Sequence, residues 1–226
     1  MKKLGRPYAD GLHHLSYGMV DLPSGRMKSR EGTIVDADDL LNEVKAAAEV
    51  ETLENGRIEG LSKEQLEDLF EMIGIAALKY FIMRVQPKKR MVFDPQESVS
   101  IKGDTGPFIQ YSYARSRSIA KKADEKGIGG DSKGYQALHD SEKAVIRQIA
   151  KYPKVLAESA NEFDPSLVCA FAIELAKSFN RMLNKVHVLR AENEDTSRFR
   201  LELCGKVAFM LKHSAGLLGI KVPEQM

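Results

Sequence analysis

Apolar residues recur at every third or fourth position through the second half of this 226-residue chain, and this spacing constrains the fold more than any other feature. One series follows Asp164-Pro165, a pair that favours a helix start because the carboxylate can cap and proline suits the first turn. Its members are Leu167, Phe171, Leu175, Phe179, Met182 and Val186. A second series, in a helix expected to start near Thr196, consists of Phe199, Leu203, Val207 and Met210. Because a helix buries its apolar stripe against other helices, the region from about Thr105 to Met226 is predicted to be an all-helical bundle.

Capping signals place further helices upstream and within the bundle. Ser62-Lys63-Glu64-Gln65 has the pattern of a capping box, and the apolar stripe behind it predicts one buried helix face. Thr105 is expected to cap a helix that has Pro107 in its first turn and continues to about Asp124. The remaining expected helices run from Asp36 or Asp38 to about Glu54, from Asp140-Ser141 onward, and after Tyr152-Pro153. The glycine-rich stretch 127–134 is interpreted as a hinge, and Met91-Val92-Phe93 as a short extended piece before a turn at Asp94-Pro95.

The first 35 residues lack helical periodicity and consist of turn signals between short extended pieces, such as Tyr17 to Val20. A complete nucleotide-binding sheet needs several more strand-helix units, so this part is interpreted as loops and strand ends. No apolar run approaches the length of about 18 residues that a transmembrane helix needs, so no membrane partner is expected. Cys169 and Cys204 lie in apolar helical patterns, which favours a reduced, cytoplasmic protein. His13-His14 has no Cys or carboxylate partner at metal spacing, so no metal site is predicted.

Charge is unevenly distributed although the net charge is only +2. The stretch from Asp36 to Glu71 holds twelve acidic and three basic residues, whereas the stretch from Lys79 to Lys126 holds eleven basic and five acidic residues. This asymmetry favours one face that meets a polyanion. Ordinary solvated helix faces would give the same composition, so charge alone does not decide between the two.

Four side chains of the helix after Thr105 point to RNA. Phe108, Tyr111, Arg115 and Lys122 follow one another at spacings of three, four and seven residues, which predicts that they share one side of the helix. Aromatic rings and guanidinium groups stack on unpaired bases, and cations meet the flanking phosphates. In the alternative interpretation, the two rings belong to the core and the two cations are merely solvated.

A second candidate site is the segment from Gly25 to Gly32, in which Arg26, Lys28 and Arg30 supply three cations within five residues. A loop of this kind can close on a triphosphate and stabilise the charge that develops on leaving pyrophosphate. The alternative is a solvated surface turn.

These segments resemble a known family. The stretch from His13 to Val20, followed by Gly25-Arg26-Met27-Lys28-Ser29-Arg30-Glu31-Gly32, resembles the end of the catalytic domain of arginyl-tRNA synthetases. The stretch Asp104-Thr105-Gly106-Pro107-Phe108-Ile109-Gln110-Tyr111-Ser112-Tyr113-Ala114-Arg115 is similar to the start of the anticodon-binding (DALR) domain in that family, and the tail from Arg200 to Met226 looks like its C-terminus. The resemblance covers essentially the whole chain.

The resemblance implies a mainly α fold, with a helical-bundle anticodon-binding domain preceded by a short α/β remnant of the class I catalytic core. The implied domains are 1–35 (end of the nucleotide-binding domain with its signature loop), 36–103 (helical connecting region) and 104–226 (anticodon-binding domain). The implied reaction is ATP-dependent attachment of arginine to its tRNA through an arginyl-adenylate, with ATP and Mg²⁺ as cofactors of the full-length enzyme. The class I His-Ile-Gly-His signature is not in this sequence. The chain is therefore expected to be an excised fragment or an incomplete reading frame that binds no cofactor and does not aminoacylate alone.

The resemblance also implies roles for individual residues. In the signature loop, phosphate contacts fall to Arg26, Lys28, Ser29 and Arg30, with Lys28 favoured. The loop departs from the Lys-Met-Ser-Lys-Ser pattern, because Arg26 replaces the first Lys, Lys28 replaces Ser, and Ser29 stands where the second Lys would be.

The implied partner is the anticodon loop of arginine tRNA, whereas ATP and arginine would bind only through a missing N-terminal part. The positions implied to contact tRNA are Phe108, where relatives usually have Tyr, together with Tyr111, Arg115, Lys122, Asn184, Val188 and the terminal Met226. Two alternatives remain open at this point. One is a non-catalytic RNA-binding or assembly module derived from a synthetase, and the other is a helical bundle that binds another protein, which Lys88-Lys89-Arg90 fits equally well.

Overall fold

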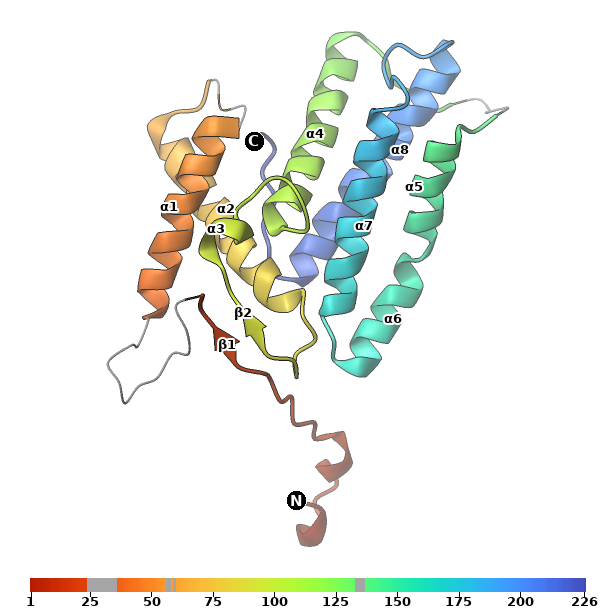
Figure 1. Ribbon diagram of the computed structural model, residues 1–226. Helices are drawn as coiled ribbons and strands as arrows, with labels where there is room; N and C mark the ends of the chain where they lie inside the picture. Colours follow the sequence, from red (N-terminus) through yellow and green to blue (C-terminus); the bar gives the residue numbers. More distant parts are fainter. Residues whose placement is uncertain (24–35, 56–57, 59, 133–136) are drawn as a thin grey trace.

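The computed structural model describes residues 1–23, 36–55, 58, 60–132 and 137–226. The fold is mainly α-helical, as predicted (Figure 1). The long helices are α1 (Ala37–Asn55), α2 (Lys63–Met83), α4 (Gly106–Glu125), α5 (Asp140–Ala150), α6 (Tyr152–Glu162), α7 (Ser166–Leu183) and α8 (Glu194–Leu217). Shorter elements are the 3-10 turns Lys2–Leu4 and Ala9–Gly11, the strands β1 (Val20–Asp21) and β2 (Met91–Val92), and α3 (Pro95–Ser98). The signature-loop segment 25–32, with Arg26, Lys28, Ser29 and Arg30, lies outside the described residues.

The capping predictions are confirmed with small shifts. Ser62 and Gln65 form a reciprocal capping box at the start of α2. The helix expected to start near Thr196 begins at Glu194, and Asn193 caps it by accepting a hydrogen bond of 2.8 Å from the Thr196 amide. At α7 the Asp164 carboxylate accepts from the Ser166 amide, so the helix begins one residue after Pro165. The turn expected at Asp94-Pro95 opens a single helical turn, α3.

The N-terminal segment joins the rest of the chain through a short parallel strand pairing and through a hydrogen bond from the Gly18 amide to the Pro87 carbonyl. Val20 pairs with Met91 and Asp21 with Val92, and the N-terminus itself lies away from the helices (Figure 1). The extended pieces predicted near Val20 and Met91 are therefore confirmed, and they are the two strands of one small sheet.

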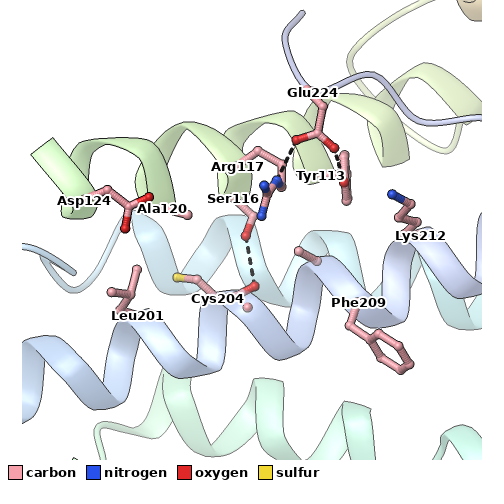
Figure 2. A pocket seen from close by; sticks show the side chains of 12 residues that line it. Tyr113, Ser116, Arg117, Ala120, Asp124, Leu201, Cys204, Phe209, Lys212 and Glu224 are labelled. Carbon is pink, nitrogen blue, oxygen red and sulfur yellow. Dashed lines mark hydrogen bonds and ion pairs between the residues drawn. The ribbon is translucent and has the colours of Figure 1, made fainter. Parts of the chain in front are cut away.

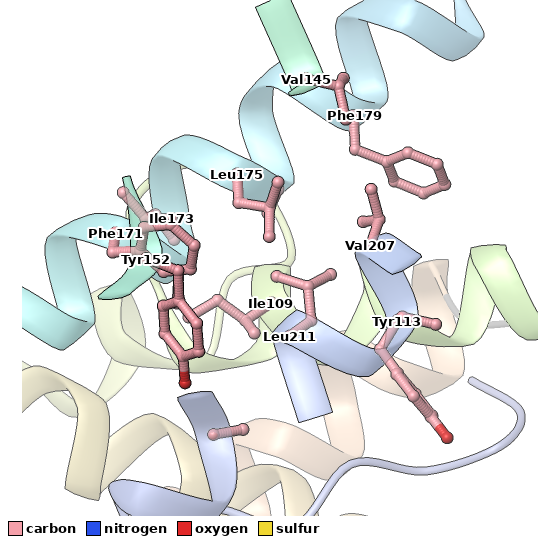
Figure 3. Close-up of a cluster of buried hydrophobic side chains, with 14 of the residues drawn as sticks. Ile109, Tyr113, Val145, Tyr152, Phe171, Ile173, Leu175, Phe179, Val207 and Leu211 are labelled. Carbon is pink, nitrogen blue, oxygen red and sulfur yellow. The ribbon is translucent and has the colours of Figure 1, made fainter. Parts of the chain in front are cut away.

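Two apolar clusters hold the helices together. The larger one fills the bundle of α4, α5, α6, α7 and α8, and Figure 3 shows Leu175 and Phe179 of α7 facing Val207 and Leu211 of α8. The second cluster lies between α1, α2, α4 and the segment from β2 to α3, with Val44, Ile73 and Phe93 fully buried. Because α2 and α4 contribute to both clusters, they join the two parts of the molecule.

The start of α4 is pressed closely against α2. A Cβ added at Gly106 would lie 2.4 Å from the Ala76 carbonyl oxygen, so only glycine fits this approach. The chain after α8 then returns between α1 and α4, where the C-terminus lies (Figure 1). This return brings the last residue of the sequence beside the middle of α4.

Candidate nucleic-acid interface

A pocket of about 360 Å³ lies beside α4, on the side that faces the chain after α7. Tyr111, Arg115 and Lys122 line it from α4. The opposite wall consists of residues 186–189, and Met226 closes one edge. The pocket therefore joins three segments that are far apart in the sequence.

The structure brings together five of the seven residues that sequence analysis assigned to tRNA contact, namely Tyr111, Arg115, Lys122, Val188 and Met226. Val188 and Met226 are buried, at 6% and 7% exposure, so they offer apolar walls. Tyr111 is partly buried against the second apolar cluster, and Lys122 is exposed at the rim. Rings, apolar walls and cations in one open pocket suit an unpaired base with its phosphate.

Phe108 is not among the residues that line this pocket, although its spacing keeps it on the same side of α4 as Tyr111, Arg115 and Lys122. It is partly buried and packs against the core of the bundle. Asn184 is exposed at the end of α7 and is not part of the pocket lining, which includes Leu183 and residues 186–189 but neither 184 nor 185. Contact of either residue with RNA remains a prediction.

Arg115 is held in place from α7. Its Nη1 donates a hydrogen bond of 2.8 Å to Oδ1 of Asn180. The Asn180 amide is itself oriented, because its Nδ2 donates to Ser112 Oγ at 2.7 Å and to the Ala176 carbonyl at 2.9 Å. Asn180 was not identified from the sequence. The one sign of it in the sequence is a polar amide directly after Phe179, a member of the apolar stripe of α7.

The wall formed by residues 186–189 is anchored by a buried ion pair. Arg200 of α8 donates 2.9 Å from Nη1 to the His187 carbonyl and 2.6 Å from Nε to Glu142 of α5. Arg200 is 4% exposed and Glu142 is completely buried. Glu142 also accepts a hydrogen bond from the His139 amide as part of the capping box of α5. The pocket wall is thereby tied to two helices of the bundle.

A second pocket, of about 490 Å³, lies between α4 and α8 and includes none of the residues assigned to tRNA (Figure 2). At its edge Glu224 meets Tyr113 and Arg117, while Ser116 donates to the Cys204 carbonyl across the helix interface.

Cys204 and Cys169 are both free and buried, as their apolar surroundings predicted. Burial raises the pKa of each thiol to about 12.

Within the described residues, no group of three His, Cys, Asp or Glu side chains is arranged to hold a metal ion. His13 instead stacks on Phe163, with 4.1 Å between the ring centres. In that same part of the chain, none of the helices has both the length and the apolar character needed to cross a membrane.

Family comparisons match both halves of the chain. The family described as the DALR anticodon binding domain matches residues 109–226, and the catalytic domain of class I (R) tRNA synthetases matches residues 1–94. The chain is 47% identical to an arginine–tRNA ligase of Amoebophilus asiaticus and 46% identical to one of Flavobacterium psychrophilum. Each of these matches covers 100% of this chain, which spans 38% and 37% of the length of the two relatives.

Among solved structures, Thermus thermophilus arginyl-tRNA synthetase superposes with a TM-score of 0.81 at 28% identity, covering 95% of this chain and 35% of that one. The Plasmodium falciparum arginyl-tRNA synthetase, at 21% identity and a TM-score of 0.71, shares the fold over 93% of this chain. Sequence and structure thus agree over nearly the full length, and the chain belongs to the arginyl-tRNA synthetase family, with its helical bundle formed by the DALR anticodon binding domain.

Proposed function

We propose that this chain binds the anticodon stem-loop of arginine tRNA in the pocket between α4, residues 186–189 and Met226. The observation that carries the proposal is the convergence of Tyr111, Arg115 and Lys122 with the apolar Val188 and Met226 around one open pocket. An aromatic ring and apolar walls suit a base, and two cations suit the phosphates on either side of it.

The orientation of Arg115 supports this assignment. Asn180 engages Nη1 of the guanidinium, and Arg115 remains part of the pocket wall. A guanidinium group has five N–H donors, so a single bond to Asn180 leaves donor capacity for a phosphate or a base edge. The group is therefore pre-oriented for a ligand.

We further propose that the longer protein to which this segment corresponds attaches arginine to its tRNA with ATP and Mg²⁺. The names of the relatives and the class I catalytic match over residues 1–94 support this proposal. In it, Arg26, Lys28, Ser29 and Arg30 contact the phosphates of ATP, and Lys28 carries the main contact. The two reduced thiols support a cytoplasmic location.

A filter-binding comparison of arginine tRNA with a tRNA for another amino acid tests the binding proposal. Tyr111→Ala should weaken binding by roughly 1–3 kcal/mol if the ring stacks on a base. Arg115→Ala should weaken binding and lower the salt dependence by about one phosphate contact. Tyr17→Ala and Arg147→Ala serve as controls, since both side chains are exposed and lie outside the pocket.

Equal affinity for both tRNAs, or a neutral Tyr111→Ala, would contradict the proposal. The 226-residue chain alone should give only background pyrophosphate exchange with arginine, ATP and tRNA, because its sequence has no His-Ile-Gly-His signature. Exchange clearly above background would show that this last expectation is wrong.

A further inference from the structure

The last nine residues, 218–226, form a tail that folds back over α2 and α4 after α8 ends. The Gly219 carbonyl accepts a hydrogen bond of 2.6 Å from Lys79 Nζ, and the Lys221 carbonyl accepts one of 2.8 Å from Gln110 Nε2. Ile220 is buried in the core of the bundle. The first part of the tail is therefore attached to the bundle by backbone contacts and by apolar packing.

The end of the tail is held differently, through the side chain of Glu224. Its Oε1 accepts 2.6 Å from the Tyr113 hydroxyl, and its Oε2 accepts 2.6 Å from Arg117 Nε. Figure 2 shows both bonds converging on the carboxylate from one stretch of α4. Tyr113 and Arg117 are four residues apart, so they lie one above the other on the helix, and each carboxylate oxygen has its own donor.

Met226 lies two residues further along and also packs against α4. It is 7% exposed, it packs in the second apolar cluster with Ala114 and Tyr111, and it lines the candidate tRNA pocket. Only Gln225 separates it from Glu224. Two residues span roughly 7 Å at most, so the position of Met226 follows that of Glu224 closely.

We propose that Glu224 is a positioning residue for tRNA recognition, and that its clamp on Tyr113 and Arg117 sets Met226 in the wall of the pocket. The proposal rests on the proposed function of that pocket. Glu224 lines the neighbouring α4–α8 pocket and is not among the residues lining the candidate tRNA pocket, so it acts through Met226.

Charge and geometry both favour the carboxylate in this role. A glutamine at position 224 has one acceptor oxygen and an NH₂ group that cannot accept from the second donor. Glu224→Gln therefore loses the ionic character of both bonds, and the Tyr113 hydroxyl keeps this partner only by turning to accept from the NH₂ group. The anchors at Gly219 and Lys221 do not depend on this side chain, so the substitution should release only the end of the tail.

The first readout needs no RNA. In the 226-residue chain labelled at its methionine methyl groups, Glu224→Gln should shift and sharpen the Met226 resonance, which Met226→Leu identifies. Glu158→Gln is the matched control, because Glu158 forms an exposed ion pair of 3.5 Å with Lys154 on α6. The control should leave the Met226 resonance unchanged. An unchanged Met226 resonance in Glu224→Gln would overturn the clamp.

The second readout is affinity for arginine tRNA. Glu224→Gln should weaken binding roughly three- to tenfold, whereas Glu158→Gln should leave it unchanged. In a Met226→Ala background the further loss from Glu224→Gln should disappear, because the side chain that it positions is gone. Equal losses in both backgrounds would overturn the positioning role. A neutral Tyr111→Ala with a shifted Met226 resonance would instead count against the proposed function while leaving the clamp intact.

Discussion

Arg115 of α4 donates a hydrogen bond to Asn180 of α7, 65 residues further along the chain, over 2.8 Å. The bond joins a pocket cation to the helix that forms the centre of the bundle. Because two further bonds orient the Asn180 amide, the oxygen rather than the nitrogen faces the guanidinium. Asn180 thus sets the direction in which Arg115 can meet a ligand.

Asn180→Ala is expected to weaken binding of arginine tRNA by about 1 kcal/mol, since Arg115 loses its orienting partner. The loss should vanish in an Arg115→Ala background, and filter binding of the four proteins measures this coupling. Thermal unfolding of the same proteins separates this effect from a general loss of stability. Additive losses from the two substitutions would contradict the positioning role of Asn180.

The Glu224 clamp predicts a pH dependence of stability. The hydrogen bond from Tyr113, aided by Arg117, lowers the pKa of the Glu224 carboxyl below its ordinary value of 4.5. A lowered pKa in the folded state means that the contribution to stability is complete above 4.5 and is lost as the pH falls through the folded value. The contribution is small because the side chain is 61% exposed.

Denaturant unfolding of the wild type and of Glu224→Gln should therefore differ at pH 7, and the difference should shrink as the pH falls through the lowered pKa of Glu224. Glu158→Gln provides the comparison for an exposed ion pair without the tyrosine contact. A difference between wild type and Glu224→Gln that stays the same down to the most acidic pH at which both proteins fold would show that the carboxylate charge is not its source.

Much of the fold could be predicted because periodicity and capping act locally. The stripes after Ser62 and Asp164 predict helices that the structure contains, and Thr105 caps α4 by accepting a hydrogen bond from the Phe108 amide. The starts of α8 and α7 differ from the expected positions by one or two residues, because several neighbouring residues can begin a helix and the pattern of apolar residues does not choose among them.

The candidate site could be predicted only in part, because it depends on contacts between distant segments. Spacing along α4 identified Tyr111, Arg115 and Lys122 but could not reveal that Phe108 packs against the bundle core and lies outside the pocket lining. Asn180 has meaning only beside Arg115, and Glu224 only beside Tyr113. Such pairs are created by packing and leave no periodic trace in the sequence.

The close approach of α4 to α2 predicts an unusual response at Gly106. In a helix, Gly→Ala ordinarily stabilises by up to about 1 kcal/mol. At Gly106 the added Cβ would meet the Ala76 carbonyl oxygen at 2.4 Å, so Gly106→Ala should instead destabilise by roughly 1–3 kcal/mol. Gly205→Ala in α8 is the matched control, because nothing lies within 4 Å of its added Cβ. Chemical denaturation should thus give opposite signs for the two variants, and equal signs would contradict the close approach.

The two thiols should be inert in the folded protein. Burial is the main cause that raises the pKa of Cys169 and of Cys204 to about 12, so almost no thiolate is present at pH 8. A thiol reagent at pH 8 should modify neither cysteine in native protein and both after denaturation. Rapid labelling of either thiol without unfolding would contradict the packing of α7 against α8.

The buried pair of Glu142 and Arg200 predicts a large asymmetry between single and double substitution. Glu142→Ala removes the carboxylate that lies 2.6 Å from Arg200 Nε and should destabilise the fold by about 3–5 kcal/mol, measured by denaturant unfolding. Glu192 moderates this loss only slightly, because its carboxylate lies 3.6 Å from Arg200 Nη1 and its side chain is 74% exposed. Replacing both partners, by Glu142→Leu with Arg200→Met, should cost much less, since no charge then remains buried.

The same double substitution separates stability from recognition. Arg200 also holds the His187 carbonyl at 2.9 Å, and His187 belongs to the pocket wall. A folded double variant should therefore keep most of its stability and still bind arginine tRNA more weakly, because residues 186–189 lose their anchor. Full tRNA affinity in that variant would mean that packing of Val186 and Val188 alone holds the wall, and that the ion pair serves only the bundle.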